Sequence, residues 1–131
     1  MILKPEYAIG IDIGGTNTVF GIVNHRGNIV YRGAISTADY ETPDVFLDAL
    51  YKALLPAIAE SGGVHTIKGI GVGAPNANYY NGTIEYAPNL RWKGIIHLAK
   101  MVGEKFDLPA AITNDANAAA VGEMNYGAAR G

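Results

Sequence analysis

Large apolar residues occupy every second position near the start of the chain, with smaller or polar residues between them. The large residues are Tyr7, Ile9, Ile11 and Ile13. This period of two predicts a strand over residues 7–13 with its large residues on one face. Two further apolar stretches, residues 18–23 and 29–35, are separated by a polar, glycine-containing turn. Because such short connections cannot hold a crossover helix, we predict that the three strands form an antiparallel meander.

A helical pattern follows the meander. Thr42, Pro43 and Asp44 form a helix start, because a hydroxyl can cap the helix, proline fits its first turn and an acid faces its positive end. Apolar residues then recur at helical spacing to about residue 60, and Ser61-Gly62-Gly63 is expected to end the helix. We expect Pro56 to kink this helix or to end its regular part.

The remaining sequence alternates strands and helices. The predicted elements are a buried strand at 68–74 parallel to the first, a hairpin at 76–87 with its turn at Asn81-Gly82, a helix at 94–106, a strand at 110–113 and a helix at 117–124. The spacing G-x-G-x-x-A at 69–74 matches a dinucleotide fingerprint, but no helix follows it. The predicted fold class is α/β, with one mixed sheet, a three-strand antiparallel portion and helices packed on its faces.

Composition and charge narrow the classes of protein. The 131 residues are 49% hydrophobic and 17% charged, which is typical of a single globular domain. The formal net charge of −2 provides no broad positive field that would attract nucleic acid. Arg91 and Lys93 beside Trp92 are interpreted as solvated residues at a rim. No nucleic acid partner is therefore expected. There is no cysteine, no apolar secretion signal and no apolar run of the ~20 residues that span a bilayer. We therefore expect a cytoplasmic protein without a membrane partner.

The first candidate site is the turn between the first two predicted strands, Gly14-Gly15-Thr16-Asn17, which begins two positions after Asp12. Glycines let a backbone approach a ligand and present its N–H groups, and the next two side chains add donors, so the turn suits a phosphate. A carboxylate beside a phosphate site commonly holds hydrated Mg²⁺, which makes Asp12 the candidate metal residue. A tight hairpin in which Asp12 only caps the turn is the alternative.

A candidate catalytic acid follows the predicted strand at 110–113. Ligands collect at the carboxyl ends of strands in α/β sheets, and Asp115 lies there beside Asn114. Its carboxylate could accept a hydroxyl proton as general base. Capping of the helix at 117–124 is the alternative role for this residue.

Amide-rich loops follow two other strand ends. Pro75 and Asn76 come directly after the strand at 68–74, and Asn89 follows the predicted hairpin. Neutral amides donate and accept hydrogen bonds at once, as recognition of sugar hydroxyls requires, so these loops indicate a polyol pocket. Turn formation is the alternative for each asparagine taken singly.

Three of these segments, in this order, resemble the ROK family of repressors, open reading frames and sugar kinases, which includes bacterial glucokinases. They are residues 12–16, 89–92 and 114–119, and the resemblance extends over residues 7–131. It implies an actin-like ATPase fold, also described as ribonuclease H-like, with two lobes. Residues 1–131 would then be the N-terminal lobe, and the C-terminal lobe would be absent from this chain.

The resemblance also implies ATP and Mg²⁺ as cosubstrates and phosphoryl transfer to a hexose or amino sugar, usually at the 6-hydroxyl. Asp12 would organise the metal and its waters, and Asp115 would be the base. The residues implied at the ATP phosphates are Gly14, Gly15, Thr16 and Asn17, and those implied at the sugar are Pro75, Asn76, Asn89 and Asn114.

The chain departs from the family pattern at one corner and lacks several of its motifs. Family members often carry Ala-Pro-Gly where this chain has Ala74-Pro75-Asn76, so the extra side chain could alter sugar choice. The Glu-x-Gly-His sugar motif, the adenine pocket and a cysteine-rich structural zinc motif belong to the second lobe. We therefore expect zinc only there, homo-oligomers through that lobe, and no useful turnover by the 131-residue fragment alone.

Two other functions compete with a kinase. The first is the sugar-sensing lobe of a ROK repressor, which would carry a DNA-binding helix-turn-helix ahead of it, whereas the first strand here is predicted near Tyr7. The presence of Asp12 and Asp115 favours catalysis. The second is another actin-like ATPase, such as a chaperone or filament protein, but the amide-rich loops favour a small hydroxylated substrate.

Overall fold

The computed structural model describes residues 6–113, which form a five-stranded mixed sheet, a small second sheet and two α-helices. The strands of the main sheet are β1 (Tyr7–Ile13), β2 (Asn17–Asn24), β3 (Ile29–Ser36), β4 (Ile67–Gly73) and β8 (Ala110–Thr113), in the order β3-β2-β1-β4-β8. The first three strands are antiparallel neighbours, and β4 and β8 continue the sheet in parallel with β1. The predicted meander and mixed sheet are confirmed.

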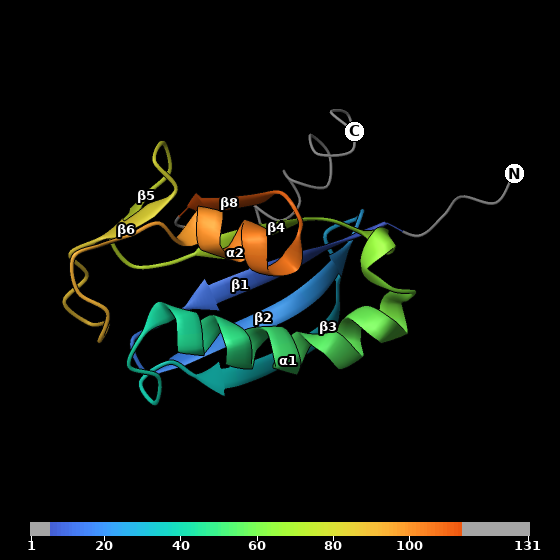
Figure 1. Ribbon diagram of the computed structural model, residues 1–131. Coiled ribbons are helices and arrows are strands. Elements are labelled where there is room, and N and C mark those ends of the chain that lie inside the picture. Colours follow the sequence, from blue (N-terminus) through green and yellow to red (C-terminus); the bar gives the residue numbers. More distant parts are fainter. Residues whose placement is uncertain (1–5, 114–131) are drawn as a thin grey trace, which may run out of the picture.

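Both helices, α1 (Pro43–Ser61) and α2 (Leu98–Phe106), cover the same face of this sheet (Figure 1). Helix α1 lies in the connection from β3 to β4, and α2 lies in the connection from β4 to β8. When successive right-handed crossovers advance in one direction along a sheet, their helices lie on the same side of it. The short 3₁₀ helix η1 (Val64–Thr66) follows α1. The predicted helix at 117–124 lies outside the described residues. Neither described α-helix is long and apolar enough to cross a bilayer.

Helix α1 begins and ends where local chemistry predicts. The Thr42 side chain accepts a hydrogen bond from the Val45 N–H at 3.3 Å, and Gly62 ends the helix with a φ of 115°. The expectation that regular structure could end at Pro56 is wrong, since the helix continues to Ser61. Pro56 and Lys52, whose carbonyl loses its N–H partner, are both exposed, so water can satisfy that group.

The second sheet contains three short strands, β5 (Ala77–Asn78), β6 (Thr83–Glu85) and β7 (Ile95–Ile96), in the order β5-β6-β7. The predicted hairpin is present, but its loop comprises residues 79–82 and places two tyrosines in the turn rather than in strands. The predicted start of the second helix at Gly94 is wrong. Residues 95 and 96 pair with β6 instead, because two-residue strands depend on a partner and leave no periodic pattern in the sequence.

The core lies between the sheet and the two helices. Ile11 and Ile13 are buried in it whereas Asp12 is exposed, so the large apolar residues share one face as predicted, although Ala8 and Gly10 on the other face are buried as well. Phe46 of α1 packs against the buried Trp92 ring, with ring centroids 4.8 Å apart. This contact ties the irregular segment that follows β6 to the main core. The segment is therefore held firmly beside the carboxyl end of the sheet.

Candidate functional site

Three strand ends lie in one row at the carboxyl edge of the parallel strands. In the register of the sheet, Asp12 of β1 is paired with Gly73 of β4, and Gly73 is paired with Thr113 of β8. Because neighbouring strands lie about 4.8 Å apart, the main chains at Asp12 and Thr113 are roughly 10 Å apart. Pro75 and Asn76 leave this edge directly after β4. Asn114 and Asp115 lie outside the described residues, so their predicted roles stay predictions.

The glycine turn is closed on itself and is anchored to the loop between β3 and α1. The Gly14 N–H donates to the Asn17 carbonyl at 3.0 Å. The Thr16 carbonyl accepts from the N–H groups of Thr37, at 2.7 Å, and Ala38, at 3.2 Å. At the base of the turn, the buried hydroxyls of Thr18 and Thr37 are 2.7 Å apart. These bonds fix the conformation of the turn relative to the loop between β3 and α1.

The turn keeps donors available for an anion. Within residues 6–113, no group accepts a hydrogen bond from the N–H of Gly15 or Thr16, and the Thr16 and Asn17 side chains are exposed. Free N–H groups in a tight turn form a concavity that suits a phosphate, so the residues present fit the phosphates of ATP. Asp12, exposed beside the turn, fits Mg²⁺, which commonly takes one or two carboxylates and completes its shell with water and phosphate oxygens. No group of three acidic or histidine side chains is positioned to enclose a metal in the described part of the chain.

The glycine turn and the segment of Asn89 pack against each other. A Cβ built on Gly15 would stand 2.7 Å from the Asn89 carbonyl oxygen and 3.1 Å from its Cβ. Only glycine allows this approach, because real Cβ atoms do not come so close to other atoms. The structure thus brings together two predicted site segments that are distant in the sequence.

Asn76 has a structural function in addition to its predicted one. Its backbone is left-handed, with a φ of 54°, a region that glycine adopts freely and asparagine tolerates. This explains why the corner suits either glycine or asparagine. Its Nδ2 donates to the carbonyls of Glu85, at 3.0 Å, and Tyr86, at 3.1 Å. The amide hydrogens therefore hold the β5–β6 hairpin, and Oδ1 is the atom left to accept from a ligand.

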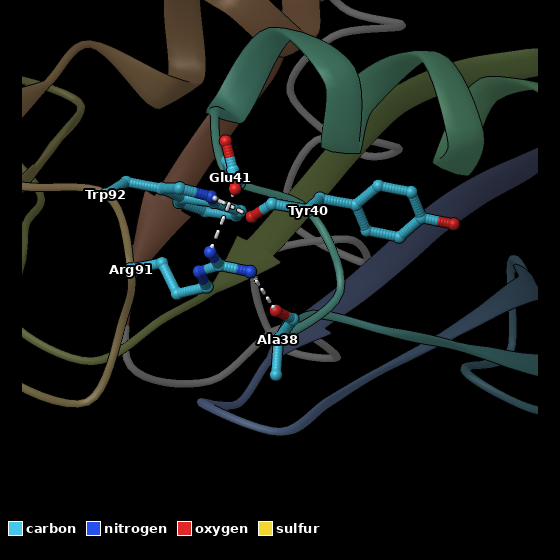
Figure 2. A network of polar contacts seen from close by, with 5 residues as sticks. All are labelled: Ala38, Tyr40, Glu41, Arg91 and Trp92. Carbon is cyan, nitrogen blue, oxygen red and sulfur yellow. Dashed lines mark hydrogen bonds and ion pairs between the residues drawn. The ribbon is translucent and has the colours of Figure 1, made fainter.

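A polar network beside the site was missed in the sequence (Figure 2). Arg91 donates from Nη1 to the Ala38 carbonyl at 2.9 Å and from Nη2 to Glu41 at 3.2 Å. Trp92 donates from Nε1 to the Tyr40 carbonyl at 3.1 Å. The interpretation of Arg91 as only a solvated residue is therefore incomplete, because its side chain makes two specific contacts although it is 49% exposed. No local pattern could reveal these contacts, because their acceptors lie about fifty residues earlier in the chain.

The pKa of Glu85, a carboxylate in the second sheet, is changed by the residues around it. A short hydrogen bond of 2.6 Å from the Thr83 hydroxyl lowers the pKa of Glu85, helped by the amides of Asn78 and Asn81. Glu85 therefore stays ionised at neutral pH within the small sheet. A general base for a sugar hydroxyl needs a pKa nearer the working pH, so this lowered value does not favour Glu85 in that role.

An apolar cavity of about 470 Å³ lies elsewhere in the molecule. It is lined by the C-terminal parts of α1 and α2 and by η1, including Tyr51, Leu55, Phe106 and Leu108. These elements surround the start of β4, at the opposite end of the sheet from the glycine turn. The cavity is therefore separate from the candidate site.

Comparisons with known proteins identify the family and the fold. The ROK family profile matches residues 8–131. The glucokinase of Streptomyces coelicolor is 36% identical over 124 residues, covering 94% of this chain and 37% of the relative. The xylose repressor of Bacillus subtilis is 32% identical over 131 residues, covering 97% of this chain and 33% of the relative. The crystal structure of a ROK family glucokinase from Streptomyces griseus, in complex with glucose and AMPPNP, matches with a TM-score of 0.69 and 34% identity, covering 95% of this chain and 38% of that one.

The sheet order, the two helices on one face and these structural neighbours define an actin-like ATPase fold. The chain belongs to the ROK family. It spans only 37% of the length of the Streptomyces coelicolor glucokinase. The similar proteins include both sugar kinases and transcriptional repressors.

Proposed function

We propose that residues 1–131 form the N-terminal lobe of a two-lobe, ATP-dependent sugar kinase that phosphorylates a hexose or amino sugar, as a glucokinase does, at the 6-hydroxyl. The observation that carries the proposal is the contact between Gly15 and Asn89, which joins a turn suited to phosphate with an amide-bearing loop suited to a sugar. A phosphoryl donor and a hydroxyl acceptor must meet for transfer, and here the segments proposed to bind them already do.

The proposed roles at the nucleotide follow from the turn. The free N–H groups of Gly15 and Thr16 would donate to phosphate oxygens, with Gly14 and Asn17 closing the turn around them. Asp12 would hold Mg²⁺ directly or through its waters. When bound, the metal neutralises charge on the phosphates during transfer.

The proposed roles at the acceptor follow from the other strand ends. Asn89, Asn114 and Asn76 would bind sugar hydroxyls, with Pro75 shaping the corner of the pocket. Asp115 would take the proton from the attacking hydroxyl as its oxygen bonds to the γ-phosphorus and the bond to ADP breaks. Asp12 would hold the metal and Asp115 would take the proton, so the two acids would have separate tasks.

A repressor is the second candidate, favoured by the 32% identity to the Bacillus subtilis xylose repressor. A sugar-sensing lobe needs the same amide-rich loops, because it also binds sugar hydroxyls. It does not need a general base or a metal ligand.

Purified full-length protein distinguishes the two functions. With ATP, Mg²⁺ and glucose or an amino sugar, a kinase releases ADP in a coupled assay and yields a sugar phosphate whose position is assigned by phosphorus NMR. No ADP release with any hexose, together with sugar-dependent binding to operator DNA, would contradict the kinase and support the repressor.

A further inference from the structure

Arg91 reaches from the sugar-side segment to the loop that supports the glycine turn (Figure 2). It lies two residues after Asn89, and its guanidinium contacts the β3–α1 loop at the Ala38 carbonyl and the Glu41 carboxylate. Both acceptors are on one loop, and a planar guanidinium presents two donors in a fixed geometry, so the side chain holds this loop at two points.

Ala38 carries the link onward to the turn. Its carbonyl accepts from Arg91 at 2.9 Å, and its own N–H donates to the Thr16 carbonyl at 3.2 Å. Gly15, the residue before Thr16, packs against Asn89. The contacts therefore close a ring that runs from Thr16 through Ala38, Arg91 and Asn89 to Gly15 and back to Thr16.

We infer that Arg91 is a positioning residue that couples the nucleotide turn to the sugar segment. The inference rests on the proposed function, in which Gly15 and Thr16 face phosphates and Asn89 faces the sugar. A closed ring fixes the distance between the two segments, so a shift of one on ligand binding is transmitted to the other. Misplacement of reacting groups by about 1 Å can cost roughly a hundredfold in rate, which makes such a restraint consequential.

The fold itself does not depend on this side chain. Arg91 and Glu41 are 49% and 79% exposed, and exposed ion pairs contribute little to stability. Trp92 anchors the same segment separately, since its ring is buried and its Nε1 donates to the Tyr40 carbonyl. Loss of the Arg91 contacts should therefore weaken substrate binding and leave the melting temperature nearly unchanged.

The experiment uses the full-length protein with Arg91→Ala, Arg91→Lys and Glu41→Gln. Arg26→Ala, in the exposed turn between β2 and β3, is the matched control because it removes the same charge outside the ring. Steady-state assays give kcat and the KM for sugar and for ATP, and calorimetry gives the sugar Kd with and without AMPPNP and Mg²⁺. Thermal unfolding is measured for every variant.

We expect Arg91→Ala to raise both KM values by about tenfold and to reduce the effect of AMPPNP on the sugar Kd by a similar factor. Arg91→Lys, which can still donate to the Ala38 carbonyl, should recover most of the loss. Glu41→Gln and Arg26→Ala should resemble the wild type, because neither breaks the ring.

The outcomes separate the inference from the proposed function. An inactive wild type that binds neither sugar nor AMPPNP contradicts the kinase proposal and removes the basis of the inference with it. An active wild type with an unaffected Arg91→Ala contradicts only the positioning role. Equal effects of Arg91→Ala and Arg26→Ala, no recovery by Arg91→Lys, or unfolding of Arg91→Ala contradict that role as well.

Discussion

The carbonyl oxygen of Asn89 lies 2.7 Å from the point at which a Cβ on Gly15 would stand. The two residues come from separate parts of the sequence and meet backbone to backbone at the carboxyl edge of the sheet. A methyl group added at Gly15 cannot be accommodated by a rotamer change, because the obstructing atom belongs to the main chain. The contact therefore links the requirement for glycine at position 15 to the position of the segment that contains Asn89.

Gly15→Ala is expected to displace Asn89 and to raise the KM for sugar more than tenfold. Overpacking typically costs about 1–3 kcal/mol of stability, which urea unfolding of the full-length protein would measure. Gly33→Ala is the control, since its Cβ would meet the buried Phe20 ring at 2.7 Å, away from the turn. If the two variants lose stability and activity in the same proportion, the contact has no specific role in sugar binding.

Asp115→Asn should lower kcat by about a hundredfold or more with the fold intact, because general base catalysis typically supplies about 10²- to 10⁴-fold. Asp12→Asn should also lower kcat, because the metal that it would hold neutralises charge on the transferred phosphoryl group. Asp12→Asn should also raise the Mg²⁺ concentration at half-maximal rate, whereas Asp115→Asn should not. Asp39→Asn, an exposed acid in the β3–α1 loop, is the control. Normal turnover by Asp115→Asn in the coupled ADP assay would exclude it as the base.

Asn76→Gly should be tolerated better than Asn76→Ala, by about 1 kcal/mol in urea unfolding, because only glycine adopts a φ of 54° without strain. Both variants lose the Nδ2 bonds to the Glu85 and Tyr86 carbonyls. Asn76→Asp should be worse than glycine, since a carboxylate would face those two oxygens. Equal stability of the glycine and alanine variants would show that backbone strain is not the constraint.

Trp92→Phe removes the Nε1 donor but keeps an aromatic ring beside Phe46. The partly buried Tyr40 carbonyl then loses its partner, and a typical hydrogen bond contributes about 0.5–1.5 kcal/mol to stability. We expect a loss of that size in the free energy of unfolding. Phe46→Leu provides the comparison, because it removes the ring contact and leaves the hydrogen bond. A neutral Trp92→Phe would mean that water replaces the indole donor.

The contribution of the Asp48–Lys105 surface pair to stability should decrease at acid pH. The hydrogen bond and charge of Lys105 hold the pKa of Asp48 below its ordinary value of about 4. A lowered folded-state pKa adds stability above the unfolded value, and that stability is lost as pH falls from about 4 through the folded pKa. The difference in urea midpoint between the wild type and Lys105→Met should therefore shrink as the pH is lowered below about 5. Lys100→Met, on the same helix, should show no such trend.

Elements with local signals were predicted well. The cap at Thr42, the alternation along β1 and the glycine at 62 each act within a few residues, so their effects are visible in the sequence. The two-residue strand β7 and the continuity of α1 past Pro56 were not predicted. The first depends on pairing with β6, and the second depends on which face of the helix meets solvent.

By itself, the sequence determined the strands of the main sheet, the first helix, the glycine turn after Asp12 and the family pattern, because caps, turns and periodicity are short-range properties of the chain. Only the tertiary structure decided that Gly15 meets Asn89, that Asn76 holds a hairpin through its amide, and that Arg91 joins two loops. Those relationships depend on the order of strands in the sheet and on where the packed Trp92 ring places its segment. Neither is encoded within any single stretch of residues.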